Sequence, residues 1–135
     1  MGKLVTLGKD GIPTGDEFLK LRLRELRNEI VRILPQWQAR LGVSCRRIRW
    51  GEAKTKWGSC NVQTRVIMLN VALGSMPPQL IEYVLVHELN HLIHPDHSPA
   101  FHADMDRWLP DWRERKKQLG SFGPLFLPPL EEEIT

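Results

Sequence analysis

The sequence lacks several features that would assign it to other classes of protein. Its 135 residues include only two cysteines, Cys45 and Cys60, and no CxxC pair, which excludes a zinc ribbon and a disulfide framework. Its hydrophobic stretches, such as residues 66–73 and 80–86, are far shorter than the ~20 residues of a membrane helix. The N-terminal residues contain no sustained apolar run that would indicate a secretory signal. We therefore expect a cytoplasmic protein without membrane contacts, with free thiols and with Cys60 buried and inert.

Strong charge of one sign is also missing. Lys and Arg number 19 against 16 Asp and Glu, a formal net charge of +3, and the chain has no dense basic stripe of the kind that marks a dedicated nucleic-acid binder. Hydrophobic residues make up 41% of the chain, as in an ordinary globular protein. We expect a lead-in over residues 1–15, one domain over residues 16–120 and an irregular tail over residues 121–135.

The first periodic segment predicts a long helix over residues 16–41. Its apolar residues follow i+3/i+4 spacing, and they are Leu19, Leu23, Leu26, Ile30, Ile33, Trp37 and Leu41. Gly42 supplies a stop, and Pro35 is expected to kink or split the helix because it removes a backbone hydrogen bond. The other face is basic.

Residues 43–73 read as β-structure. Ile48 and Trp50 alternate with Arg47 and Arg49, and a second β-branched segment spans residues 65–71. Between them, residues 54–61 read KTKWGSCN and are expected to form a strand entering a tight turn. The assembly expected is a small antiparallel sheet of about three strands.

Helical signals return after the strands. Ser75 is expected to cap a helix with a broad apolar surface that Pro95 ends, and Ser98 with Pro99 to open the next helix. A last short helix is expected over residues 111–119, closed by Gly120. The fold class is therefore α+β, with the small sheet packed on the helix before Pro95, a long N-terminal helix and short C-terminal helices.

The segment HELNH, from His87 to His91, carries the clearest chemistry. Two histidines four residues apart lie on one face of a helix, about one turn from each other, so both imidazoles can reach one zinc ion. Glu88 lies about 100° around the helix from His87, beside the metal, where it could hold a water molecule. Two ligands leave such a site incomplete, so a third is required.

Three further histidines compete for the third position. His94 lies roughly 10.5 Å along the helix from the first histidine, too far for one ion to bind both together with His91. His97 follows Pro95, where the chain can turn back across the helix face, and His102 lies one turn into the next helix. His97 is the favoured ligand, while His94, His102 and the downstream carboxylate of Asp104 are the alternatives.

Taken together, these motifs resemble those of the YgjP-like zinc metallopeptidases. The resemblance covers roughly residues 20–119 and rests on TKWGSC, the strand RVIMLN and the segment HELNHLIHPDHSPAF. It implies a minimal zincin-like metalloprotease domain with one zinc ion per chain, held by His87, His91 and His97, and with Glu88 as the catalytic acid/base. SprT-like and WLM-type proteases share the spacing of these histidines and are neighbouring families.

The resemblance leads to further expectations about the reaction and the substrate. Glu88 would take a proton from the attacking water and pass it to the leaving amine of a peptide bond. Tyr83 and the turn over residues 57–61 are candidate donors to the oxyanion, and His102 is a candidate support of the metal site. By analogy with zincins, residues 65–70 are the candidate strand edge for a peptide or protein substrate, ordered by Asn70.

Two other hypotheses differ in class from a peptidase. The first is a nucleic-acid-associated protein, with or without proteolysis, whose arginines bind phosphates with a steep salt dependence: Arg22, Arg24, Arg27, Arg32, Arg46, Arg47 and Arg49. The second is a non-catalytic zincin-fold protein that binds a partner. The presence of Glu88 beside all three candidate ligands argues against this second hypothesis.

Overall fold

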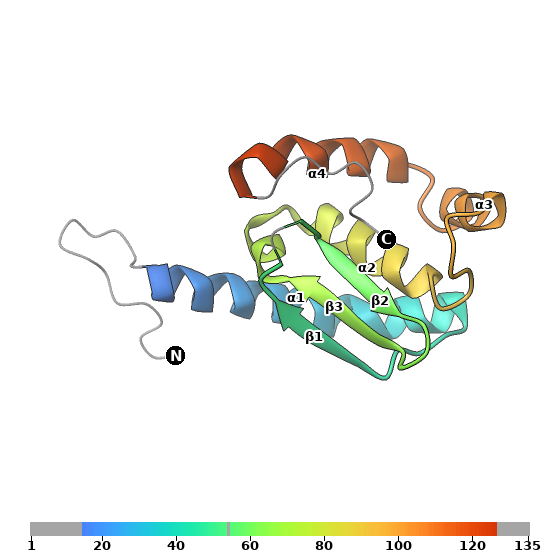
Figure 1. The fold of residues 1–135 in the computed structure, drawn as a ribbon, viewed down its shortest axis with the longest axis horizontal. Coiled ribbons are helices and arrows are strands. Elements are labelled where there is room, and N and C mark those ends of the chain that lie inside the picture. Colours follow the sequence, from blue (N-terminus) through green and yellow to red (C-terminus); the bar gives the residue numbers. More distant parts are fainter. Residues whose placement is uncertain (1–14, 54, 127–135) are drawn as a thin grey trace.

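The structure is a computed structural model that describes residues 15–53 and 55–126. Its elements, in chain order, are α1 (Gly15–Leu41), β1 (Arg47–Gly51), β2 (Gly58–Asn61), β3 (Val66–Asn70), the short 3-10 helix η1 (Val71–Ser75), α2 (Pro78–Asn90), α3 (Pro99–Trp108) and α4 (Trp112–Phe126). Figure 1 shows the sheet lying across α1 and α2, with α4 packed on α2. This arrangement confirms the α+β class. Within the described ranges, no helix is long and apolar enough to cross a bilayer.

The long helix α1 closely follows the predicted stripe. Its buried residues are Leu26, Ile30, Ile33, Trp37 and Leu41. The helix is not split at Pro35, because Ile33 and Trp37 are buried in the core on both sides of the proline. It ends at Gly42, as predicted, where a φ of 74° favours glycine and the backbone N–H bonds to the carbonyl of Gln38.

The sheet is mixed rather than antiparallel, which corrects the sequence-based expectation. The strand order is β1-β3-β2, with β1 parallel to β3 and β2 antiparallel to it. The pair β2–β3 is a hairpin, and β1 lies beyond β3 on the side away from β2. The alternation of Arg47 and Arg49 with Ile48 indicates which face of β1 is polar, but it carries no information on strand direction or order.

Two of the three later helices, α2 and α4, differ from prediction at their ends. Ser75 ends η1 instead of capping α2, whose N-cap is Pro77 without a side-chain hydrogen bond. The helix α2 also ends at Asn90, before the expected stop at Pro95. Ser98 caps α3 as predicted, because its hydroxyl oxygen accepts the N–H of Phe101 at 3.2 Å.

The last helix is longer than predicted. Gly120 lies inside α4, which continues to Phe126, so residues 121–126 of the expected irregular tail are helical. The rest of the tail, residues 127–135, and residues 1–14 of the expected lead-in lie outside the described residues.

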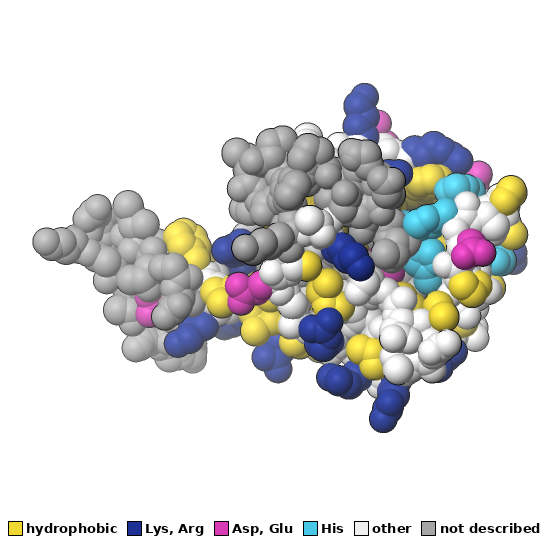
Figure 2. All heavy atoms as spheres, in the orientation of Figure 1, with side chains coloured by type: hydrophobic (Ala, Val, Ile, Leu, Met, Phe, Trp, Pro, Cys, Tyr) yellow, Lys and Arg dark blue, Asp and Glu magenta, His cyan; other side chains and the backbone are white. Residues whose placement is uncertain are grey.

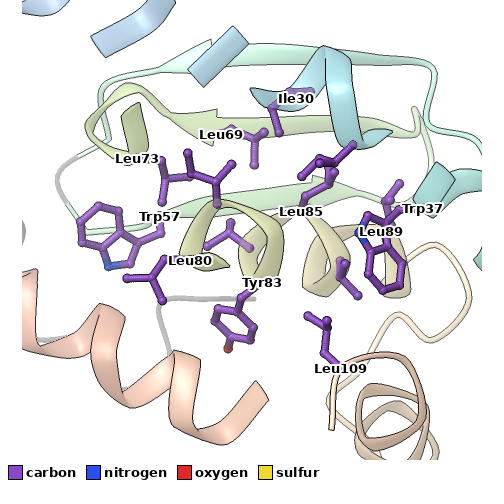
Figure 3. Packing of buried hydrophobic residues seen from close by; sticks show 14 of the residues in the cluster. Ile30, Trp37, Trp57, Leu69, Leu73, Leu80, Tyr83, Leu85, Leu89 and Leu109 are labelled. Carbon is purple, nitrogen blue, oxygen red and sulfur yellow. The ribbon is translucent and has the colours of Figure 1, made fainter. Parts of the chain in front are cut away.

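One core joins α1, η1, α2 and the inner face of the sheet. Figure 3 shows Leu85 and Leu89 of α2 directed toward Ile30 and Trp37 of α1. Trp57, which precedes β2, is fully buried in the same cluster. The close packing of η1 on α1 depends on a glycine: a Cβ on Gly74 would lie 1.9 Å from the carbonyl oxygen of Arg22.

Candidate metal centre

Three imidazoles converge beside the end of α2. His87 and His91 are buried on the same face of the helix, with exposed fractions of 5% and 3%. The Nε2 atom of His97 lies 3.1 Å from that of His91 and 3.3 Å from that of His87. Figure 2 shows the histidine side chains gathered at one end of the molecule, beside α3. The structure therefore brings together the three histidines that the sequence favoured.

The chain places His97 there by turning back after α2. The residues after Asn90 form turns, and Ser98 and Pro99 then begin α3 in a new direction. His97 is the residue before the N-cap, so the capping hydrogen bond from Phe101 to Ser98 fixes the backbone next to it. The motif HSPxF thus places a ligand candidate and starts a helix within five residues.

Phe101 forms the apolar floor of this cluster. Its ring centroid lies 4.9 Å from that of His87, 4.7 Å from that of His91 and 5.1 Å from that of His97. The buried amide of Asn90 donates to the carbonyl oxygen of Phe101 at 3.1 Å and ties α2 to α3. Both residues restrict the imidazoles to their converging arrangement.

The donor atoms fit a tetrahedral metal ion. Two nitrogens at roughly 2.05 Å from a zinc ion with tetrahedral angles would lie roughly 3.3 Å apart, which matches the observed separations. The Nδ1 atom of His91 lies 3.0 Å from the carbonyl oxygen of His94. Because a carbonyl oxygen only accepts, Nδ1 carries the proton and Nε2 keeps its lone pair for the centre of the cluster. Burial, and then the neighbouring His91 and His97, hold the pKa of His87 well below its usual value, so this imidazole is neutral at pH 7.

Glu88 lies on α2 next to the cluster and is fully buried. Its carboxylate packs against β2 at Gly58, where a Cβ would lie 3.2 Å from Oε2 of Glu88 and 2.9 Å from Cγ1 of Val84. The WGSC segment therefore provides a wall without a side chain for this carboxylate. Glu88 directly follows His87 on α2, and a carboxylate can accept and release a proton at a reacting group.

The remaining histidines lie outside the cluster. The Nε2 atom of His94 lies 2.7 Å from Oδ2 of Asp104, so its side chain points to α3. The ring of His102 stacks on Trp112 at a centroid distance of 5.6 Å and on His97 at 6.4 Å. His94 thus holds the turn to α3 with its side chain and orients His91 with its carbonyl.

Tyr83 is fully buried, with its ring centroid 5.8 Å from that of His87 in an edge-to-face contact. Figure 3 shows the ring directed away from the sheet. Burial, and then the charge of Glu88, raise the pKa of its hydroxyl. Within the described residues this hydroxyl has no hydrogen-bond partner. The contact supports His87 from one side, whereas the use of Tyr83 as an oxyanion donor stays a prediction.

The prediction that residues 65–70 form the strand edge for the substrate is wrong. Residues 65–70 include β3, which is the central strand and already has hydrogen-bonded strands on both sides. Among the described strands, the edge nearer to α2 is β2. Asn70 has a structural role instead: its amide donates to the carbonyls of Ala53 and Lys56 at 2.8 and 2.9 Å, and its oxygen accepts the N–H of Ala72 at 2.9 Å. It holds the loop that leads into Gly58.

Sequence reasoning included Gly58 in the candidate turn over residues 57–61 and Phe101 in the motif segment, but it did not predict that Gly58 lies against Glu88 or that Phe101 forms the floor of the cluster. It missed Asn90 altogether. The signals for Gly58 and Asn90 were present, because a glycine in a strand marks a close approach and a polar residue on an apolar helix face marks a buried hydrogen bond. Neither signal shows which residue lies on the other side of the contact, Glu88 for Gly58 and Phe101 for Asn90.

Two solved structures with a similar fold are zymogens of metallopeptidases. The zymogen of abylysin from Pyrococcus abyssi gives a TM-score of 0.63 at 21% sequence identity, over 68% of this chain and 92% of that one. The zymogen of jannalysin from Methanocaldococcus jannaschii gives 0.55 at 19% identity, over 70% and 92%. At these identities the similarity shows the fold alone. A comparison with curated proteins gives no match.

The family follows from the sequence itself. The family model "YgjP-like, metallopeptidase domain" matches residues 15–122, which is most of the chain. This protein therefore belongs to the YgjP-like family. The resemblance noted from the motifs is thereby confirmed. The class of enzyme is a peptidase, a hydrolase that depends on a metal.

Proposed function

We propose that this chain hydrolyses peptide bonds with one zinc ion held by His87, His91 and His97, and with Glu88 as the general base. The observation that supports this most directly is that Nε2 of the exposed His97 lies 3.1 Å from Nε2 of His91 and 3.3 Å from Nε2 of His87, both of which are buried. Three neutral imidazoles are a zinc donor set that leaves a fourth position open.

When bound, zinc supplies a Lewis acid that polarises a carbonyl group and makes water more acidic. Glu88 takes the proton of the attacking water at a carboxylate oxygen and then gives it to the nitrogen of the leaving amine. The wall at Gly58 keeps the carboxylate in one position, and the floor at Phe101 keeps the imidazoles oriented. The peptide is thus split into a free carboxyl and a free amine.

The substrate is expected along the outer edge of β2. Among the described strands β2 is paired with β3 on one side only, so its other edge can add an extended peptide by backbone hydrogen bonds. Gly58 at the start of this strand contacts Glu88. A peptide bound here therefore passes the general base.

Metal content tests the ligand set. We expect about one zinc per chain by plasma mass spectrometry, lost in His97→Ala and kept in His102→Ala, a matched control that removes an imidazole outside the cluster. Full zinc occupancy in His97→Ala would show that another residue is the third ligand. A wild-type chain that fails to take up added zinc would refute the zinc site.

Activity tests the role of Glu88. The variant Glu88→Gln should keep its zinc and lose hydrolysis of a casein or peptide-library substrate by ~100-fold or more. An active, zinc-loaded Glu88→Gln would refute the general-base role. A zinc-loaded wild type that cleaves none of these substrates would favour the non-catalytic zincin-fold protein.

A further inference from the structure

The outer face of the sheet, turned away from α1 and α2, contains a hollow of about 480 Å³. Arg46, Arg47 and Arg49 line one part of it, and polar side chains from β2 and the following turn line the other. None of its lining residues belongs to the metal centre. Figure 2, in the orientation of Figure 1, shows basic side chains along the β1 side of this face.

The strand register explains how these side chains meet. Arg47 is paired with Val66, and Asn61 is paired with Val66 from the other side, so the three lie in one row across the sheet. A second row contains Arg49, Met68 and Ser59. Residues in such rows point to the same face, and the two arginines are spaced at about 6.8 Å along the strand.

Within residues 15–53 and 55–126, Arg46, Arg47 and Arg49 form no ion pair. None of the described residues that line the hollow is acidic. Every arginine ion pair in the described part of the chain involves other arginines: Arg32, Arg107, Arg113 and Arg115. Three neighbouring guanidinium groups without a counter-charge repel one another and attract an external anion.

The rim of the hollow is fixed by hydrogen bonds. Arg65 has a backbone φ of 64°, which is unusual for a residue other than glycine. Its guanidinium donates two hydrogen bonds to the carbonyl of Ser44, at 2.6 and 3.2 Å. Its own carbonyl accepts the N–H of Arg46 at 2.7 Å. On the other side, Oδ1 of Asn61 accepts the N–H groups of Gln63 and Thr64. These bonds hold the backbone on both sides of the hollow in place before any ligand binds.

We propose that this hollow binds the sugar–phosphate backbone of a nucleic acid. Guanidinium groups form paired hydrogen bonds with phosphate oxygens, and the hydroxyls of Ser59 and Thr64 are further donors of the type found at phosphates. A row of arginines along a strand fits a ligand whose charges repeat along a chain. The concave shape disfavours a flat bilayer. The lining residues that the structure describes include no aromatic side chain for bases to stack on, so we expect contacts to phosphates that are independent of sequence.

Fluorescence anisotropy with the full chain tests this binding without use of the peptidase activity. The probe is a labelled single-stranded DNA of about 16 nucleotides, titrated at several salt concentrations. The triple variant R46S/R47S/R49S removes three charges from the hollow. Its matched control, K20S/R24S/R27S, removes three charges from the exposed side of α1, where these residues line a separate hollow. Thermal unfolding of both variants checks that they are folded.

We expect R46S/R47S/R49S to bind the DNA at least tenfold more weakly than wild type at low salt. We also expect its slope of log K against log salt to be smaller by about 2 to 3, while K20S/R24S/R27S stays close to wild type in both quantities. Equal losses in both variants, or no binding by the wild type at low salt, would overturn the proposal. So would arginine-dependent binding of phosphoserine peptides or phosphatidylserine vesicles without binding of DNA.

Discussion

Gly58 and Glu88 are in contact across the interface of β2 and α2, and the contact leaves no room for a side chain on the glycine. A Cβ there would lie 3.2 Å from Oε2 of Glu88 and 2.9 Å from Cγ1 of Val84. These two atoms belong to one helix, and the carbonyl oxygen of Met68 on β3 would also lie 3.2 Å from the Cβ. The helix, the carboxylate or the pairing with β3 would therefore have to shift. The glycine of the WGSC segment is therefore tied to the geometry of the proposed general base.

Gly58→Ala is expected to lower kcat by tenfold or more while zinc content remains near one per chain, because a misplaced proton acceptor slows the reaction without removing a ligand. Kinetics and metal analysis measure the two quantities separately. Gly120→Ala is the matched control, because nothing lies within 4 Å of a Cβ at Gly120. If Gly58→Ala lost zinc together with activity, Gly58 would be required for the site as a whole.

A second prediction concerns His94, which lies between two of the candidate ligands in sequence. Its side chain bonds to Asp104 and its carbonyl accepts the proton of His91 Nδ1. We expect His94→Ala to keep one zinc per chain and to bind it roughly tenfold more weakly, because the turn that orients His91 is loosened. Competition with a chelator measures this affinity.

Asp104→Asn should give a similar loss of zinc affinity, because it weakens the same contact from the other side. A His94→Ala variant that loses zinc completely, as expected for His97→Ala, would make His94 a ligand. A variant with wild-type affinity would show that the contact with Asp104 does not support the metal centre.

The sequence predicted that His87, His91 and His97 lie together, but it did not predict the strand order of the sheet, and the reason is physical. The histidine pair at His87 and His91 and the cap at Ser98 are local signals, since spacing on one helix and a capping hydrogen bond involve near neighbours. Strand order is not local. The β-branched segment over residues 65–71 was consistent with an edge strand or a central strand, and only the pairing of β3 with both β1 and β2 shows which it is.

The same distinction applies to the helix ends. Apolar residues up to Leu92 suggested that the helix continues to Pro95, but it ends at Asn90, where the buried amide bonds to the start of α3. The helix thus ends at a residue that makes a tertiary hydrogen bond, whereas helix propensity alone predicts a later end. Gly120 illustrates the converse, because a helix packed on α2 continues through a glycine.

A third prediction concerns the reactivity of Cys60. Burial, and then the charge of Glu88, raise the pKa of this thiol to about 12. Because a raised pKa keeps the thiol protonated, its alkylation should increase about tenfold per pH unit between about pH 8 and 10, where an ordinary cysteine approaches its plateau. Iodoacetamide labelling in a Cys45→Ser background, followed by intact mass, measures the rate.

The same assay reports on Glu88. Glu88→Gln removes a negative charge near Cys60, so the thiol pKa should fall and labelling at a fixed pH of about 9 should become faster. A plateau near pH 9 in the wild type would contradict the raised pKa. An unchanged rate in Glu88→Gln would indicate that Glu88 carries no charge when Cys60 titrates.

The last prediction concerns the residue that connects three helices. Glu82 of α2 accepts the indole N–H of Trp37 at 2.7 Å and a guanidinium N–H of Arg115 at 2.8 Å, so α1, α2 and α4 meet at one carboxylate. Glu82→Ala leaves the buried indole without an acceptor, and we expect the free energy of unfolding to fall by about 1 to 2 kcal/mol. Partial solvent exposure of the ion pair with Arg115 keeps the loss moderate.

Urea unfolding followed by tryptophan fluorescence measures this loss, and Glu29→Ala is its matched control. Glu29 also pairs with an arginine, Arg32, but that arginine is exposed and the pair lies within one helix. Its removal should leave the unfolding midpoint almost unchanged, because solvent screens such surface pairs. Equal midpoint shifts in the two variants would mean that Glu82 acts only as a surface charge and that the indole finds another acceptor. A larger shift for Glu82→Ala would show that the carboxylate holds α1 and α4 on the helix that carries His87 and His91.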